Sequence, residues 1–104
     1  MRLFSRSTLL DFARKHPIAR GPLLAWAKEI EGARFATTAQ LRGRYRSADF
    51  VGDKVVFNVG GKSYRLIVRI AYAQPDVEPP LNGMVFVLFV GTHAEYNRID
   101  VAAL

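Results

Sequence analysis

The stretch that decides the fold is residues 49–73, DFVGDKVVFNVGGKSYRLIVRIAYA. Its apolar residues alternate with polar ones or are β-branched and aromatic, and glycine-containing turns divide it, a pattern typical of hairpins. Gly52–Asp53 separates the first two strands, and Gly60–Gly61 joins the next two through a two-residue turn that requires positive φ. We therefore predict an antiparallel meander of three strands at Ala48–Val51, Lys54–Val59 and Lys62–Ala73.

The chain that follows this meander is predicted to contain a loop, one more strand and a short helix. Three prolines in Gln74–Gly83 indicate an exposed loop, and the uninterrupted apolar run Met84–Gly91 indicates a central strand. Thr92 and Glu95 have the spacing of a capping box, in which each side chain accepts a hydrogen bond from the other residue's backbone. A C-terminal helix is therefore expected to open here and to continue through Tyr96 and Ile99.

The N-terminal part of the chain is predicted to be helical. Ser7 is the expected N-cap of a first helix, which Pro17 ends. A second helix is expected over Gly21–Gly32, with a proline in its first turn and a glycine at its end. Thr38 is expected to cap one further turn, Ala39–Arg42. The first helix has an apolar face composed of Leu9, Phe12, Ala13 and His16.

The order of these elements indicates an α+β fold in a single domain, residues 1–104. Two N-terminal helices are expected to pack on one face of an antiparallel sheet of about four strands, with a short C-terminal helix. Side chains alternate along a strand, so the long third strand presents two different faces. Tyr64, Leu66, Val68 and Ile70 are expected in the core, and Arg65, Ile67 and Arg69 on the opposite face.

Composition excludes several classes of protein. Half of the 104 residues are hydrophobic, which is enough for one core. The absence of cysteine excludes disulfides, thiolate metal sites and cysteine nucleophiles. Only His16 and His93 are available as imidazole ligands, with no carboxylate pair at ligand spacing, so neither a metal nor a small-molecule cofactor is expected. No stretch has the length of a membrane span or the apolar centre of a signal peptide, and we expect a cytoplasmic protein.

The positive charge is concentrated in the N-terminal half. Residues 1–48 hold ten Arg or Lys against three acids, whereas residues 49–104 hold five against six, for a net charge of +6. Most of the cations in the first half are arginines, whose planar guanidinium suits phosphate. A polyanion such as RNA and an acidic protein segment both fit such a surface, and composition does not distinguish them.

Arg65 and Arg69 form the first candidate site. They stand roughly 13 Å apart on one strand face, near the spacing of neighbouring phosphates in an extended strand. Guanidiniums fixed in this way can hold a scissile phosphate and stabilise the additional charge of its transition state. The alternative is the solvated face of an ordinary half-exposed sheet.

His93 and Tyr96 form the second candidate site. The positive end of the helix dipole favours a neutral imidazole at the first turn, and a neutral imidazole can accept a proton. Tyr96 follows three residues later on nearly the same helix face, where its ring can orient the imidazole, donate a proton or stack on a base. The alternative is that Thr92 and Glu95 cap the helix and that the two residues have no further role.

The remaining candidates are polar and cationic residues that suit substrate contacts. Asn58 shares a strand face with Val56, where its amide can bond either a nucleotide or the neighbouring turn. Arginines interleaved with an aromatic in residues 42–46 suit a phosphate track with a stacking ring, although such runs are also ordinary solvated surface or docking sites for acidic proteins. The residues in question are Asn58, Lys62, Arg44 and Arg46.

Two blocks of the sequence resemble one known family. They are Val56–Ile67, VFNVGGKSYRLI, and Val85–Tyr96, VFVLFVGTHAEY. Both are similar to the HigB-type toxins of the RelE/ParE superfamily. The similarity continues upstream through Ala48–Phe50, and the helical N-terminus is compatible with it.

The resemblance implies a RelE-like fold and a metal-independent endoribonuclease, an mRNA interferase that cleaves mRNA on the translating ribosome and so inhibits translation. It also implies a helix-turn-helix antitoxin of the HigA type as partner. Metal-free RNA cleavage needs a base, an acid and cationic charge stabilisation. On this hypothesis His93 is base or acid, Arg65 and secondarily Arg69 stabilise charge, and Tyr96 orients or stacks. Substrate contacts come from Asn58, Lys62, Arg44 and Arg46.

Two other functions remain open at this point. A non-catalytic toxin resembling the ParE type acts by binding a protein such as a DNA topoisomerase, and leaves RNA intact. A basic RNA-binding adaptor binds RNA without shortening it, and needs only the cationic N-terminal half.

Overall fold

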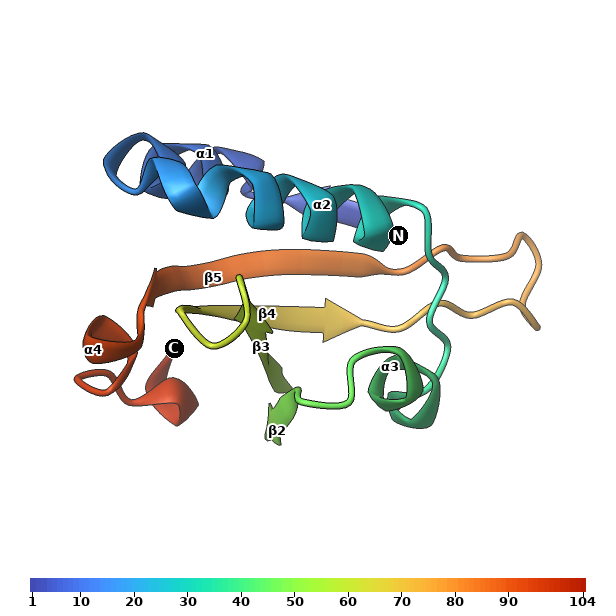
Figure 1. The fold of residues 1–104 in the computed structure, drawn as a ribbon. Coiled ribbons are helices and arrows are strands. Elements are labelled where there is room, and N and C mark those ends of the chain that lie inside the picture. The colour runs from blue at the N-terminus through green and yellow to red at the C-terminus, as the bar shows by residue number, and fades with distance from the viewer.

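The computed structural model describes all 104 residues and contains one five-stranded sheet, with the strand order β1-β5-β4-β3-β2. Helices α1 and α2 run alongside the sheet, while α4 and the C-terminus lie at one end of it (Figure 1). No helix combines the length and apolar character that a membrane span requires. The elements are β1 (Arg2–Phe4), α1 (Arg6–Lys15), α2 (Arg20–Glu31), α3 (Thr38–Arg44), β2 (Asp49–Val51), β3 (Lys54–Val59), β4 (Tyr64–Ala71), β5 (Met84–Thr92) and α4 (His93–Tyr96).

The predicted α+β fold and the antiparallel meander are confirmed. Strands β2, β3 and β4 pair in sequence order, and Gly60 and Gly61 both have positive φ in the turn between β3 and β4. That turn has four residues, 60–63, and not the predicted two, because Val59 pairs with Tyr64 and β4 begins there. Strand β5 lies beside β4, antiparallel to it, as an interior strand. The predicted sheet of about four strands was one strand short, because β1 pairs in parallel with β5. A strand of three residues carries no periodicity that would have revealed it.

The helix boundaries differ from the predictions at two N-caps. Helix α1 begins at Arg6 after Ser5, whose φ is 66°, so Ser7 lies inside the helix and is not its cap. Helix α3 is capped by Thr37 and not by Thr38, since the Thr37 hydroxyl accepts from the Gln40 backbone N–H at 3.1 Å. The two caps lie two residues and one residue before the predicted positions, which is the scale on which helix ends vary.

The core lies between the helices and one face of the sheet, as predicted. Leu66 and Val68 of β4 are fully buried there, and Tyr64 and Ile70 pack against the same cluster. The helices contribute Leu9, Leu23, Trp26, Ala27 and Ile30, and the neighbouring strands contribute Val55, Phe57, Val59, Val85 and Val87.

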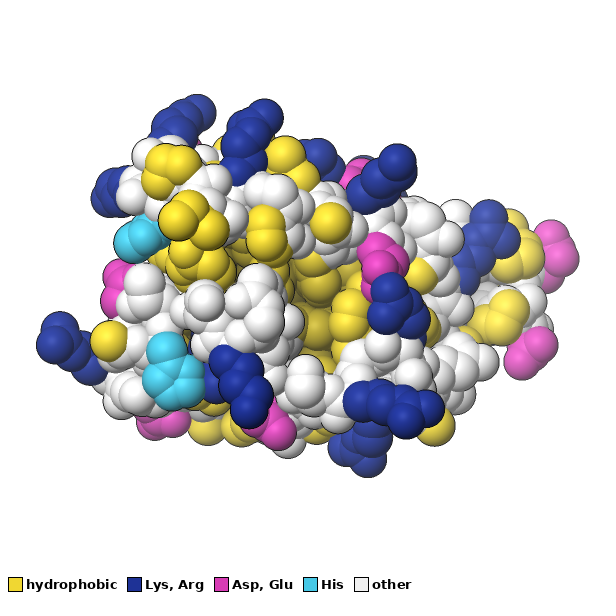
Figure 2. All heavy atoms as spheres, in the orientation of Figure 1, with side chains coloured by type: hydrophobic (Ala, Val, Ile, Leu, Met, Phe, Trp, Pro, Cys, Tyr) yellow, Lys and Arg dark blue, Asp and Glu magenta, His cyan; other side chains and the backbone are white.

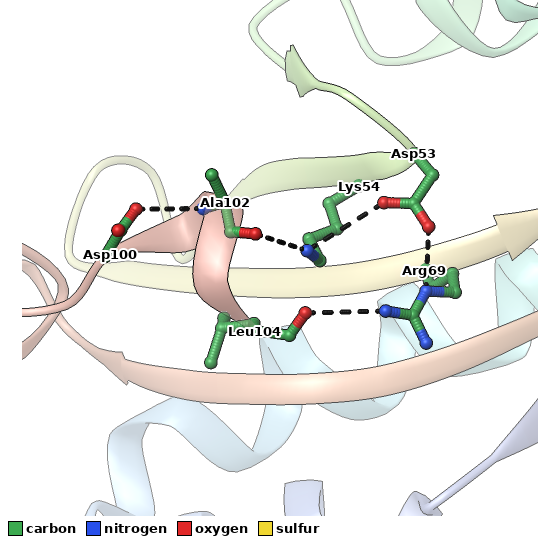
Figure 3. Close-up of polar contacts among 6 residues, drawn as sticks. All are labelled: Asp53, Lys54, Arg69, Asp100, Ala102 and Leu104. Atoms are coloured by element: carbon green, nitrogen blue, oxygen red, sulfur yellow. Dashed lines mark hydrogen bonds and ion pairs between the residues drawn. The ribbon is translucent and has the colours of Figure 1, made fainter.

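The opposite sheet face, here called the open face, is partly covered by the C-terminal residues (Figure 3). The side chain of Lys54 is buried, and its Nζ donates to the backbone oxygen of Ala102 at 3.0 Å. The carboxylate of Asp100 accepts from the Ala102 backbone N–H at 3.1 Å and so caps a 3₁₀ turn over Val101–Ala103. Helix α4 ends at Tyr96, not at the predicted Ile99, because the chain turns there to reach the open face.

Gly83 joins β5 to the loop before it, and we predict that Gly83→Ala destabilises the fold. Its φ is +80°, and an added Cβ would lie 2.7 Å from the Ala71 backbone oxygen and 2.9 Å from the Ala73 backbone nitrogen. The expected loss is about 1–3 kcal/mol of unfolding free energy, measured by urea denaturation. Gly43→Ala in α3 is the matched control, because nothing lies within 4 Å of its added Cβ. It should stabilise the protein by about 0.5–1 kcal/mol; equal effects of the two changes would contradict the explanation.

Candidate active site

Arg65 is a cationic side chain without a carboxylate partner, near the end of the open face. It stands on β4 opposite Gly91 of β5 and Asn58 of β3. Its guanidinium carbon lies 5.6 Å from the centre of the Tyr96 ring, a distance at which a cation is attracted to a ring face. The Nη1 atom is buried and has no hydrogen-bond partner. A buried donor without a partner costs free energy, so this group can gain by meeting an oxyanion.

Helix α4 positions His93 and Tyr96 through its predicted capping box, which is confirmed. The Thr92 hydroxyl accepts from the Glu95 backbone N–H at 3.2 Å, and the Glu95 carboxylate accepts from the Thr92 backbone N–H at 2.8 Å. These two bonds with Thr92 lower the pKa of Glu95 below its ordinary value. His93 is the first residue of the helix and is exposed, whereas Tyr96 is its last residue and is partly buried toward Arg65.

Asn58 connects the site to the segment that carries Arg46. Its amide nitrogen donates to the backbone oxygen of Ser47 at 3.2 Å, so the amide is used inside the protein. This contact holds Ser47, the residue after Arg46, beside β3. Asn58 itself pairs directly with Arg65 on β4. Arg46 itself is exposed and forms neither an ion pair nor a ring contact.

Lys62 lies in the β3–β4 turn, two residues before Tyr64, which pairs with Thr92 at the start of α4. Its side chain is exposed and unpaired. Figure 2 shows cationic side chains spread over the face of the molecule that is in view. The turn therefore adds an exposed positive charge at the end of the sheet where α4 begins.

The site is an open surface and not a pocket. The hollows of the molecule lie elsewhere, lined for example by Thr38, Phe50 and Tyr72, or by Leu10, Pro17 and Arg20, and none includes Arg65, His93 or Tyr96. No group of three or more His, Cys, Asp or Glu side chains is placed to hold a metal ion. The chemistry available at the site itself is a cation, an imidazole and a phenol on an accessible surface, which fits an extended anionic polymer.

Comparison with known protein families gives a match over most of the chain. The sequence model of the HigB_toxin family, described as the RelE-like toxic component of a toxin–antitoxin system, matches residues 19–99. The chain belongs to the HigB toxin family. The resemblance seen in the two sequence blocks is thus confirmed, and the matched range contains all eight predicted site residues, from Arg44 to Tyr96. No curated protein matches the chain.

Arg69 has a different environment from Arg65 in this HigB-family toxin. Its Nε donates to the Asp53 carboxylate at 2.9 Å, and its Nη2 lies 3.4 Å from the backbone oxygen of Leu104 (Figure 3). Asp53 also lies 3.9 Å from the Lys54 ammonium. The structure therefore does not bring Arg69 together with His93 and Tyr96. Asp53 was missed as its partner, although the hairpin register, which pairs Lys54 with Arg69, would have indicated it.

Arg44 of the toxin is also engaged. It forms an ion pair with Glu29 of α2, and its guanidinium carbon lies 5.1 Å from the centre of the Tyr45 ring. Burial and the nearby Glu29 carboxylate raise the pKa of Tyr45 well above its ordinary value, so this phenol stays protonated. Among the arginines of residues 42–46, Arg42 also has a partner, because its guanidinium carbon lies 4.4 Å from the centre of the Phe50 ring. Arg46 is therefore the arginine of this segment without a partner.

The lowered pKa of Glu95 predicts how α4 responds to acid. The charged carboxylate supports the capping box above the ordinary pKa of 4.5, and this support is lost as the pH falls through the lowered value. The first turn of α4 should therefore remain ordered at pH 4.5 and fray at lower pH. Amide hydrogen exchange of Thr92 and Glu95, followed by NMR, measures this. Glu95→Gln is the control, because an uncharged side chain at this position should remove the acid dependence; a persistent dependence would contradict the assignment.

Proposed function

We propose that this toxin is a metal-independent endoribonuclease that cleaves mRNA. The observation that carries the proposal is the Arg65 guanidinium, which has no carboxylate partner, has a buried and unpaired Nη1, and lies against Tyr96 beside the first turn of α4. A preorganised donor of this kind stabilises charge as it develops, without first having to break an internal ion pair. Membership of a family of RelE-like toxic components supports the proposal.

The proposed reaction is attack of a ribose 2′-hydroxyl on the adjacent phosphorus. His93 accepts the proton of the 2′-hydroxyl, and Arg65 stabilises the additional negative charge on the phosphorane. The bond to the 5′-oxygen then breaks, that oxygen takes a proton from water or from the Tyr96 hydroxyl, and a 2′,3′-cyclic phosphate remains. The Tyr96 ring restricts the rotation of the guanidinium, which keeps its donors directed at the phosphate.

The remaining cations are proposed to hold the RNA on either side of the scissile phosphate. Lys62 and Arg46 are exposed and unpaired, so both can bind phosphates without losing another contact. Arg44 and Arg69 are half exposed in their ion pairs, with side-chain exposures of 56% and 47%. Exposed ion pairs of this kind contribute at most about 1 kcal/mol to stability. An RNA phosphate can therefore replace the Glu29 or Asp53 carboxylate as a secondary contact. Asn58 contributes by fixing the Arg46 segment.

The partners proposed for the toxin are mRNA on the translating ribosome and a helix-turn-helix antitoxin of the HigA type. An open site suits a substrate that is presented by another assembly, because the site itself encloses nothing. The description of the family as one component of a toxin–antitoxin system supports the antitoxin.

We predict that Arg65→Ala lowers RNA cleavage about 100- to 1,000-fold, as expected for removal of one preorganised donor to a transition state. Arg69→Ala is the matched control on the same strand face, and should lower cleavage by less than about tenfold because its guanidinium is engaged by Asp53. His93→Gln should resemble Arg65→Ala. The measurement is single-turnover cleavage of a short RNA by purified toxin.

Mapping of transcript ends after brief induction tests the same proposal in cells. New 5′ ends should appear with the parent and not with Arg65→Ala. Growth arrest with intact transcripts would contradict ribonuclease activity and favour a toxin that acts by binding a protein. Equal loss of cleavage in Arg65→Ala and Arg69→Ala would contradict the distinction between the two arginines.

The salt dependence of RNA binding tests the phosphate contacts. Each phosphate contact to a single strand contributes about −0.7 to the slope of log K against log salt. Lys62→Gln and Arg46→Gln should each make the slope shallower by about that amount, measured with an uncleavable 2′-O-methyl RNA. Arg14→Gln is the control, because Arg14 lies on α1 and pairs with Asp11. If all three changes reduce the slope equally, the RNA binds the basic half as a whole and not this site.

A further inference from the structure

Gly91 is the point at which two groups approach the β5 backbone more closely than a side chain would allow. A Cβ built at Gly91 would lie 2.5 Å from Cζ and 2.9 Å from Cε1 of the Phe89 ring. It would also lie 3.2 Å from Cβ of Glu95 in α4. Gly91 is nevertheless buried, so the ring and the helix together cover the bare backbone. Glycine inside a strand often marks such a close approach.

The position of Gly91 connects this packing to the candidate active site. Gly91 is the direct cross-strand partner of Arg65, and Phe89 is the partner of Ile67 on the same face. The Phe89 ring therefore reaches along β5 to a point alongside Arg65. Helix α4, which carries Tyr96, begins two residues after Gly91. One missing side chain thus affects both the ring beside Arg65 and the helix above it.

We propose that Gly91 is a positioning residue of the Arg65 site. Because Gly91 has no side chain, the Phe89 ring can lie over its backbone beside Arg65. For the same reason α4 can approach the sheet closely enough for Tyr96 to face the guanidinium. A methyl group at this position requires the ring to move, and Ile67, the buried cross-strand partner of Phe89, restricts movement of the ring toward β4. The ring then turns outward or toward Arg65, and Glu95 is pushed away from the strand.

The kinetic part of this inference rests on the proposed ribonuclease function. A displacement of reacting groups by about 1 Å can lower a rate by up to about 100-fold. We expect Gly91→Ala to lower kcat by about 10- to 100-fold with little change in KM, because Lys62 and Arg46 bind the substrate independently of Gly91. Gly21→Ala in α2 is the control for the same chemical change, because nothing lies within 4 Å of its added Cβ, and it should leave both constants at the parent values.

Rescue by a second substitution distinguishes positioning from general damage. The two atoms nearest the added Cβ, Cζ and Cε1 of Phe89, are absent from leucine. Phe89→Leu alone should change kcat by less than about threefold, and the double variant Gly91→Ala/Phe89→Leu should recover at least about tenfold over Gly91→Ala. Thermal unfolding of all variants shows whether the populations compared are folded.

A spectroscopic readout tests the geometry without any reference to cleavage. The Tyr96 ring should shift the Arg65 side-chain NMR resonances, and Tyr96→Leu provides the unshifted reference. Gly91→Ala should move these resonances toward that reference, and the double variant should restore them. If the parent cleaves no RNA but the resonances behave in this way, the proposed function fails and the positioning role stands.

Two results would overturn the inference. One is a Gly91→Ala protein with parental kcat and parental Arg65 resonances, which would mean that the Phe89 ring moves without disturbing the site. The other is a Gly91→Ala protein that is impaired but not rescued by Phe89→Leu, which would mean that the Phe89 ring is not the group that the methyl displaces.

Discussion

The alternation of side chains along β4 is the constraint on which the rest of the molecule depends. Leu66 and Val68 are fully buried against the helices, and their placement requires Arg65 and Arg69 to stand on the open face. A slip of one residue in the register would exchange the faces and place two guanidiniums in the apolar core, at a large desolvation cost. The packing of α1 and α2 therefore fixes where the positive charge of the site lies, although neither helix contributes a residue to it.

Features that depend on local pattern were predictable from the sequence, and features that depend on distant contacts were not. The face of Arg65 followed from period-two alternation, and the start of α4 followed from the spacing of Thr92 and Glu95. Strand β1 could not be predicted, because its three residues carry no periodic pattern and pair with β5, which is about 80 residues away in the chain. The end of α4 was misplaced for a similar reason: the bond from Lys54 to Ala102 connects residues 48 positions apart.

The two strand arginines show why sequence spacing alone could not rank the site residues. They share a strand and a face, yet Asp53 engages Arg69 while the Nη1 atom of Arg65 has no partner. An unpaired buried donor costs about 1–3 kcal/mol, which is a substantial share of the stability of a small domain. Native structures satisfy nearly all such groups, so the unpaired Nη1 beside the Tyr96 ring supports the proposal that an anionic ligand binds Arg65.

Helix α4 has four residues, too few to be stable as an isolated helix. Its orientation must therefore come from contacts at both ends and beneath it. The capping box fixes the first turn, Gly91 permits close approach to β5, and the bond from Lys54 to Ala102 anchors the chain that leaves the helix. Since His93 and Tyr96 both lie on this helix, the geometry of the site persists only while all three contacts do. The side chains proposed to react thus lie on an element that is not stable by itself, and on this proposal a partner that disturbed any one of these contacts would disable the site without touching Arg65.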